Sequence, residues 1–329
     1  MRYVLRKLGF YLVAAWAALT INFVLPQLIP GNPVEALIGR MAQSGGAPPG
    51  EAKVLTSLLG LGTGNILQKY WQYLDGLAHF RLGLSVTNFP TPVSTEIGQS
   101  IYWTLILVGT ATVVSFVLGI GLGALAGWKR GSKLDAIIPA TTLLTAMPYF
   151  WLALLFVYVF ASNVWHVLPQ GQGYDTNSEL NVGWNLPFLA SALQHAILPA
   201  LTIVIASVAG WIVGMRNMMV TTMDEDYVLV AQAKGLPKRR VIWYAARNAV
   251  LPSISSFANA LSFVVAGSLL TELVFSYQGI GSLLLSAVQS EDYPLIQGIF
   301  LIITFVVLAA NLFADTVYVL LDPRTRQEA

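Results

Sequence analysis

Six long apolar stretches constrain what this chain can fold into more than any other feature. They run approximately over residues 8–29, 101–128, 136–165, 195–215, 254–275 and 294–321, and their only acidic residues are Glu272 and Asp315. A helix needs roughly 20 apolar residues to cross a hydrocarbon layer about 30 Å thick. The chain is 56% hydrophobic and 10% charged, too few charges to cover an ordinary water-exposed surface. The sequence therefore predicts an all-α integral membrane protein with six transmembrane helices.

The first apolar stretch resembles a secretory signal peptide, because Arg2, Arg6 and Lys7 precede it. Its apolar part is too long for such a signal, however, and no convincing cleavage site follows. We therefore expect a retained first transmembrane helix within residues 1–30.

The distribution of basic residues predicts the orientation of the bundle. Six spans place the chain start, the second and fourth connections and the chain end on one side, which the positive-inside rule assigns to the cytoplasm. Four basic residues lie instead in the long segment 31–99, and long external segments cross the membrane largely regardless of charge. The cytoplasmic set is Arg2, Arg6, Lys7, Lys129, Arg130, Lys133, Arg216, Lys234, Lys238, Arg239, Arg240, Arg247, Arg324 and Arg326.

Two segments are expected on the external side. Residues 31–99 form an insertion that opens at PGNP, 30–33, and its stretch 65–80 predicts a helix with four aromatic residues. This helix is expected either to cap the bundle or to offer a docking surface for a soluble partner. The loop 166–194 can serve either purpose too. The remaining residues, 100–329, hold the second to sixth spans and a cytoplasmic loop at about 216–251.

Three glycines in the second span, at positions 119, 123 and 127, form two overlapping GxxxG patterns. Such a row of small residues lets another helix approach closely, so we expect a packing seam here rather than a substrate site.

Residues capable of catalysis are scarce. The chain has no cysteine, its three histidines are isolated, and HExxH, GxSxG and GxxxxGK[ST] patterns are absent. We therefore expect no catalytic residue, no metal site, no cofactor and no ATPase site in this chain. Glu272 and Asp315 lie near the ends of their spans, where a snorkelling or partner-paired carboxylate is favoured over an ion relay, although ion-coupled transport stays an alternative.

A polar stretch, DEDYVLVAQAKGLPKRR at 224–240, interrupts this apolar chain between the fourth and fifth spans. The acids at 224–226 suit a helix N-terminus, where carboxylates bind free N–H groups and complement the dipole. Gly235 suits a left-handed C-terminal cap, and Pro237 suits the start of a second helix. The small side chains of Ala231 and Ala233 would let this backbone enter a groove on another protein, although an ordinary amphipathic loop has the same spacing.

Motifs along nearly the whole chain resemble the dipeptide and oligopeptide permease family of ABC importers. The loop resembles the coupling loop of that family in AQAKGLPKRR at 231–240, RN at 247–248 and LP at 251–252. Further similar motifs are LIPGNP at 28–33, MPYFW at 147–151, LPQGQGY at 168–174, HAILPALT at 195–202, TELVFSYQGIG at 271–281, DYPLIQG at 292–298 and LDPRTR at 321–326. The chain departs from the family pattern at Asn32, Gln278 and FRLG at 80–83.

This resemblance implies a type I ABC importer permease fold with both termini in the cytoplasm of a bacterial or archaeal cell, in the plasma membrane. It implies a second homologous permease subunit, two cytoplasmic ABC ATPase subunits that bind ATP and Mg, and an external solute-binding protein. No nucleic acid is expected as a partner. The coupling residues that it implies are Asp226, Tyr227, Ala231, Ala233, Lys234 and Gly235, and we expect Glu272 and Phe275 to act at the pathway or a gate.

Three alternatives stay open at this point. Within the same family the substrate can be a di- or oligopeptide, an oligosaccharide or nickel. From another class of protein, an ion-coupled secondary transporter that acts alone would share the same hydropathy, and a membrane-bound enzyme is a third reading.

Overall fold

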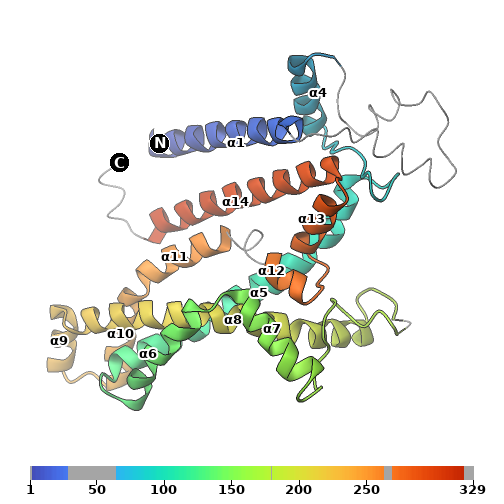
Figure 1. Cartoon of the computed structure of the whole chain (residues 1–329). Helices are drawn as coiled ribbons and strands as arrows, with labels where there is room; N and C mark the ends of the chain where they lie inside the picture. The colour runs from blue at the N-terminus through green and yellow to red at the C-terminus, as the bar shows by residue number, and fades with distance from the viewer. Residues whose placement is uncertain (1, 29–63, 179, 263–268, 322–329) are drawn as a thin grey trace. The chain divides into compact units, whose positions relative to one another are not determined.

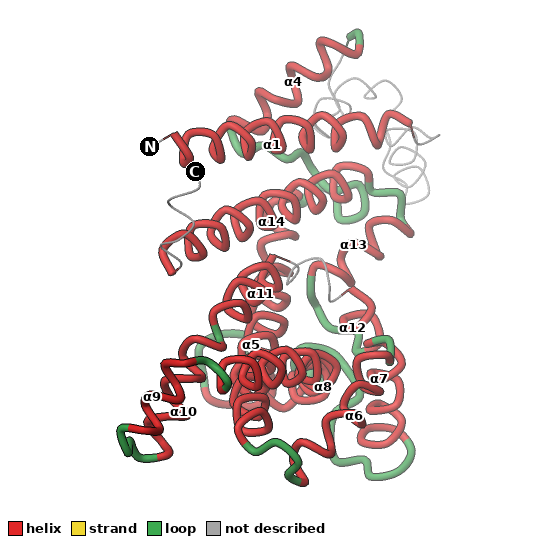
Figure 2. Tube along the Cα trace, turned by 90° about the vertical axis from the view of Figure 1, so that its left-hand side faces the viewer, coloured by secondary structure: helices red, strands yellow, loops and turns green. Residues whose placement is uncertain are grey.

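The computed structural model describes residues 2–28, 64–178, 180–262 and 269–321, and these residues form helices joined by loops (Figures 1 and 2). Among these residues the only β-type pairing is an isolated bridge between Leu84 and Pro92. The expected all-α class is confirmed. The PGNP opening of the insertion and the basic residues Arg40, Lys53, Arg324 and Arg326 lie outside the described residues.

The helices follow one another without a strand between them in the described chain. In order they are α1 (Arg2–Leu28), α4 (Ile66–Ala78), α5 (Val93–Trp128), α6 (Lys133–Ala146), α7 (Tyr149–Phe156), the π-helix η1 (Val157–Ser162), α8 (Leu186–Met223), α9 (Asp226–Ala233), α10 (Lys238–Ala249), α11 (Leu251–Ser262), α12 (Leu269–Val274), α13 (Ile280–Gln289) and α14 (Tyr293–Leu321).

Three of these helices are long and apolar enough to cross a membrane: Val93–Trp128, Leu186–Met223 and Tyr293–Phe313. Shorter apolar helical segments run over Gly9–Leu25, Tyr149–Ser162 and Ile280–Gln289. The described helices therefore fit a membrane protein, as the sequence predicts.

The chain divides into two compact units. The first comprises Met1–Trp103 and Gln278–Leu308, and within it α4 packs on α1. The Phe23 ring lies 5.2 Å from that of Tyr70 and 5.5 Å from that of Tyr73. The Asn65 side chain and the Gln68 side chain form a capping box that starts α4. Tyr70 and Tyr73 thus serve packing, which favours the expected cap for these two residues, whereas Trp71 is 65% exposed.

Helix α5 begins before the second apolar stretch. Its first residue is Val93, which is fully buried, so the last residues of the segment expected as the external insertion, 31–99, are helical. Just before α5, the segment 84–92 is held by Asp292, the residue that precedes α14. The Asp292 carboxylate accepts hydrogen bonds from the Ser85 hydroxyl at 2.5 Å and the Thr87 N–H at 2.8 Å. A search for charge-free stretches misses this helix start, because the acidic residue Glu96 lies in the first turn of α5.

The second unit comprises Thr104–Tyr277 and Ala309–Ala329 and contains the glycine seam. A Cβ at Gly119 would lie 2.3 Å from the Trp211 Cβ, and one at Gly123 would lie 2.6 Å from the Ile212 carbonyl oxygen. At Gly127 the nearest atom would be the Met219 Cβ, at 2.7 Å. Contacts this short leave no room for a methyl group, so the three glycines let α5 and α8 touch backbone to backbone, as the GxxxG pattern predicts.

The third apolar stretch is not a single helix, and of the fifth only the two ends are described. Helices α6 and α7 are separated at Met147 and Pro148, because proline lacks the N–H that a continuing helix requires and disfavours helical geometry in the residue before it. Helices α11 and α12 flank residues 263–268, which are not described. Helix α8 exceeds the expected fourth stretch at both ends, and α13 was not expected at all.

A helical loop and an adjoining cavity as the candidate functional site

The stretch that interrupts the apolar chain forms a helix-turn-helix between α8 and α11. Helix α9 spans Asp226–Ala233 and α10 spans Lys238–Ala249, so the expected pair of helices is present. Glu225 is the N-cap of α9, but its side chain makes no capping hydrogen bond. The expectation that an acid caps this N-terminus through its side chain is therefore wrong for Glu225, and the acids 224–226 are all solvent-exposed.

Gly235 ends α9 in the predicted left-handed conformation, with φ of +71°. The Gly235 N–H donates to the Gln232 carbonyl at 2.9 Å and the Leu236 N–H to the Ala231 carbonyl at 3.3 Å. These two bonds form a Schellman motif, which satisfies carbonyls at a helix end. A Cβ at Gly235 would have no heavy atom within 4 Å, so its backbone conformation, and not crowding, is what requires glycine.

One face of the loop is buried against α8. Val228 and Ala231 of α9 pack with Met215 and Met219 of α8 and with a seam on α10, which consists of Val241, Ala245 and Ala249. Figure 1 shows α9 and α10 together beside the C-terminal end of α8. Ala231 is only 8% exposed, so its side chain packs within this chain, and its part in coupling stays a prediction. Its small side chain allows α9 to approach α8 and α10.

The opposite face of α9 is open and partly apolar. Tyr227 is 43% exposed, and Leu229 and Val230 are each 51% exposed. The other proposed coupling residues, Asp226, Ala233, Lys234 and Gly235, are exposed as well. Exposed apolar side chains on a two-turn helix fit a protein interface. Leu229 and Val230 were not singled out from the sequence, although they lie between Val228 and Ala231, whose three-residue spacing places these two on one side of a helix.

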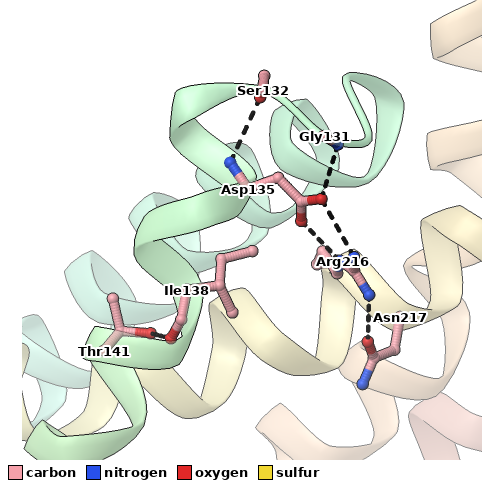
Figure 3. A network of polar contacts seen from close by, with 7 residues as sticks. All are labelled: Gly131, Ser132, Asp135, Ile138, Thr141, Arg216 and Asn217. Carbon is pink, nitrogen blue, oxygen red and sulfur yellow. Dashed lines mark hydrogen bonds and ion pairs between the residues drawn. The ribbon is translucent and has the colours of Figure 1, made fainter.

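An ion pair fixes the end of α8 that leads into this loop (Figure 3). The Arg216 guanidinium donates to both Asp135 carboxylate oxygens, through Nε at 2.9 Å and Nη2 at 3.3 Å, and so joins α8 to the first turn of α6. The Gly131 N–H donates to the same carboxylate at 2.9 Å. Hydrogen bonds from Arg216 and then from the Gly131 backbone hold the Asp135 pKa below its usual value. A weaker, exposed pair joins Arg130 and Asp224 at 3.8 Å.

A cavity of about 860 Å³ lies among α5, α7, α8, α11 and α12. Along α8 it is lined by Ser207, Gly210, Gly214 and Asn217, which recur at helical spacing on one face. The Tyr149 hydroxyl of α7 lies 3.4 Å from the Ser207 hydroxyl. Hydroxyl, amide and apolar groups make up the described lining, which includes no charged side chain. Most of the lining surface is apolar, with hydroxyl groups and one amide set into it, and such a wall suits an uncharged solute that has both polar and apolar groups.

Glu272 and Phe275 do not line this cavity. Glu272 is fully buried and accepts a hydrogen bond from the Thr104 hydroxyl at 2.7 Å, while its neighbour Thr271 does reach the cavity. Phe275 is 1% exposed, and its carbonyl accepts the Gln172 N–H at 2.7 Å. Of the two arrangements expected for Glu272, the partner-paired carboxylate is therefore present and the snorkelling one is not. No cluster of three His, Asp or Glu side chains that could hold a metal occurs in the described part of the chain.

Comparison with a family model places these features in context. The model described as "Binding-protein-dependent transport system inner membrane component" matches residues 119–327. This range contains the glycine seam, the ion pair, the helical loop and the cavity wall formed by α7, α8, α11 and α12.

Relatives of known name match the chain over nearly its full length. The dipeptide transport system permease protein DppB of Escherichia coli (strain K12) is 31% identical, over 100% of this chain and 99% of the relative. The di/tripeptide transport system permease protein DppB of Pseudomonas aeruginosa is 32% identical, over 100% and 99%. The oligopeptide transport system permease protein AppB of Bacillus subtilis is 28% identical, over 98% of both.

Proposed function

Because this chain belongs to the family of inner membrane components of binding-protein-dependent transport systems, we propose that it is the peptide-conducting permease subunit of an ATP-driven importer. The relatives that support a peptide substrate are named for transport of dipeptides, tripeptides or oligopeptides and match over nearly their whole length. The uncharged, hydroxyl-rich and amide-containing cavity wall is compatible with a peptide backbone.

In this proposal the chain crosses the inner membrane six times, with both termini in the cytoplasm and an external insertion after α1. It forms half of the pathway, and a second homologous permease subunit forms the other half. Two cytoplasmic ATPase subunits bind ATP and Mg, and an external binding protein delivers the solute. The chain itself carries no ATPase site.

The observation that carries the proposal is the exposed face of α9 on a rigidly packed base. Tyr227, Leu229 and Val230 face outward, while Val228 and Ala231 are clamped against α8 and α10. A force applied to the exposed face is therefore transmitted to α8 and, through α10, to α11. Both helices line the cavity.

We propose that closure of the ATPase subunits on nucleotide moves α9 and thereby switches the cavity between inward-open and outward-open packing. Differential binding of a few kcal/mol suffices to shift such a two-state equilibrium. Glu272 acts in this scheme from behind the cavity wall, where its bond to Thr104 joins α12 to α5. Uptake by a Glu272→Gln variant is expected to fall. Uptake at the normal rate would show that Glu272 has no role in gating.

The experiment that tests the proposal is uptake by the complex purified from its native membrane and reconstituted in liposomes with its binding protein. Labelled di- and oligopeptides are expected to enter only when ATP is supplied on the cytoplasmic side. If oligosaccharides or nickel compete with the labelled solute for uptake and peptides do not, the proposed peptide substrate is wrong. Uptake driven by an ion gradient without the ATPase subunits would replace the whole proposal with a secondary transporter.

A further inference from the structure

Helix α10 exposes a second surface that the coupling proposal does not use. This surface, here called the basic-aromatic face, consists of Arg239, Arg240, Trp243, Tyr244 and Arg247, all of them solvent-exposed. Trp243 is 68% exposed and Tyr244 is 45% exposed. We propose that this face binds the headgroups of anionic phospholipids in the cytoplasmic leaflet.

Helical geometry separates this face from the packed side of α10. Arg239, Trp243 and Arg247 are four residues apart and therefore lie along one side of the helix. The buried residues Val241 and Ala245 are displaced from them by two positions, which is about 200° around the helix axis. The fold thus turns the seam toward α8 and α9 and leaves the cations and aromatic rings together on the outside.

The charge of α10 selects an anionic occupant. The helix sequence KRRVIWYAARNA contains four cations and no acidic residue. None of the ion pairs found in the described part of the chain involves these four cations. Basic residues attract anionic lipid headgroups, and Trp and Tyr are enriched where a protein meets the membrane interface. The combination fits a phosphate-bearing surface that also accepts aromatic rings.

The position of α10 in the chain indicates that the anionic surface is the membrane, because α10 lies just before a predicted transmembrane stretch. Helix α11 begins at Leu251, and the fifth apolar stretch begins at about Ile254. Arg247 is seven residues before Ile254, which is at most about 10 Å along a helix. The headgroup layer adds roughly 5–7 Å on each side of the hydrocarbon. Arg247 is therefore close to the headgroups. Arg239 lies about 12 Å further along α10, so the proposal requires α10 to run along the membrane surface and place both arginines at the headgroups. The inference depends on membrane location alone, not on the coupling role of α9.

Native mass spectrometry of the full chain purified with its partners tests this inference. Added phosphatidylglycerol is expected to be retained in preference to phosphatidylcholine. The double variant Arg239→Gln/Arg247→Gln should weaken phosphatidylglycerol binding about 30-fold, because each basic residue near the surface contributes about 1 kcal/mol and 1.4 kcal/mol corresponds to a factor of ten. The matched control Arg239→Lys/Arg247→Lys keeps both positive charges and should leave binding within about threefold of the unmodified chain, which is less than 1 kcal/mol.

A second measurement keeps the inference testable if the double variant folds poorly. Brominated phosphatidylglycerol is expected to quench part of the tryptophan fluorescence, and the Trp243→Phe variant should lose that quenched part. Equal retention of the two lipids, equal loss in the control pair, or quenching unchanged by Trp243→Phe would each overturn the inference. So would a double variant that binds lipid normally but loses the ATPase subunits, because the face would then belong to a protein partner.

Discussion

Arg216 Nε of α8 lies 2.9 Å from Asp135 Oδ1 of α6, and this contact joins two helices whose residues are 81 positions apart in the chain. The same carboxylate accepts the Gly131 N–H, so the turn between α5 and α6 is held to the end of α8 as well. Three elements therefore meet immediately before the helical loop. In the proposed mechanism, this junction gives α9 a fixed base on which to act.

The Asp135 carboxylate predicts a pH dependence of stability. Its pKa is lowered in the folded chain, so its stabilising contribution is complete above the ordinary aspartate value of about 3.9 and is lost as pH falls through the lowered pKa. The unmodified chain should therefore lose stability between about pH 5 and 2 more steeply than Asp135→Asn, which has no proton to take up. Thermal unfolding of the detergent-solubilised chain across this range measures the difference.

The control for this prediction is Asp226→Asn, which removes an equal charge from an exposed position on α9. It should leave the acid limb of the unfolding curve as steep as in the unmodified chain. Equal slopes for Asp135→Asn and the unmodified chain would show that the pair with Arg216 contributes nothing to acid stability.

Gly235 should determine whether ATP hydrolysis stays coupled to uptake. Gly235→Pro removes the N–H that bonds to Gln232 and forces φ to about −65°, so the Schellman turn cannot form. The variant should insert in the membrane, but substrate-stimulated ATP hydrolysis and uptake should both be lost. Gly235→Asn should keep most of both activities, because asparagine tolerates left-handed geometry and the site has room for its Cβ. Normal coupling in Gly235→Pro would contradict the role given to this turn.

The glycine seam predicts a contrast between two positions on one helix. Gly123→Ala places a Cβ within 2.6 Å of the Ile212 carbonyl oxygen and should destabilise the chain by about 1–3 kcal/mol. Gly121→Ala, two residues away, places its Cβ in open space and should be neutral or slightly stabilising. Unfolding temperatures of the two purified variants make the comparison. Equal temperatures would mean that α5 and α8 do not pack through this seam.

Gly210 should limit the size of what passes through the cavity. It lines the cavity, and a Cβ there would meet nothing within 4 Å, so a larger side chain can enter the space without disturbing the packing. Gly210→Phe should reduce uptake of oligopeptides at least tenfold and dipeptides less, with normal membrane insertion. Gly109→Phe, at a similarly open position that does not line the cavity, serves as the control. Equal uptake by both variants would place the pathway elsewhere.

Much of the architecture follows from the sequence because its signals are local. Charge-free stretches indicate the long helices, Gly235 indicates the end of α9, and the GxxxG pattern indicates close helix packing. The break at Met147 and Pro148 was also available locally, since proline interrupts helices, yet the continuous apolar run concealed it. Helix α13 was missed because its ten residues are too few to resemble a span.

The remaining features depend on contacts between distant residues. Ala231 looks like a partner-facing residue by size alone, and only the packing of α8 and α10 around it shows that it is buried. The pairing of Asp135 with Arg216 and of Glu272 with Thr104 joins residues 81 and 168 positions apart. No spacing rule along the chain indicates either pair. The cavity likewise needs five helices in place before its lining residues can be chosen.

The exposed face of α9 provides the most direct test of the central claim. The chain contains no cysteine, so single cysteines at Leu229, Ala233 or buried Ala231 are unique sites for a short bifunctional cross-linker. In intact cells, Leu229→Cys and Ala233→Cys should capture an ATP-hydrolysing subunit, and Ala231→Cys should capture it far less. Failure of both exposed sites to capture such a subunit, with the cysteines accessible to a small maleimide, would contradict the claim that this loop receives the force that moves the permease.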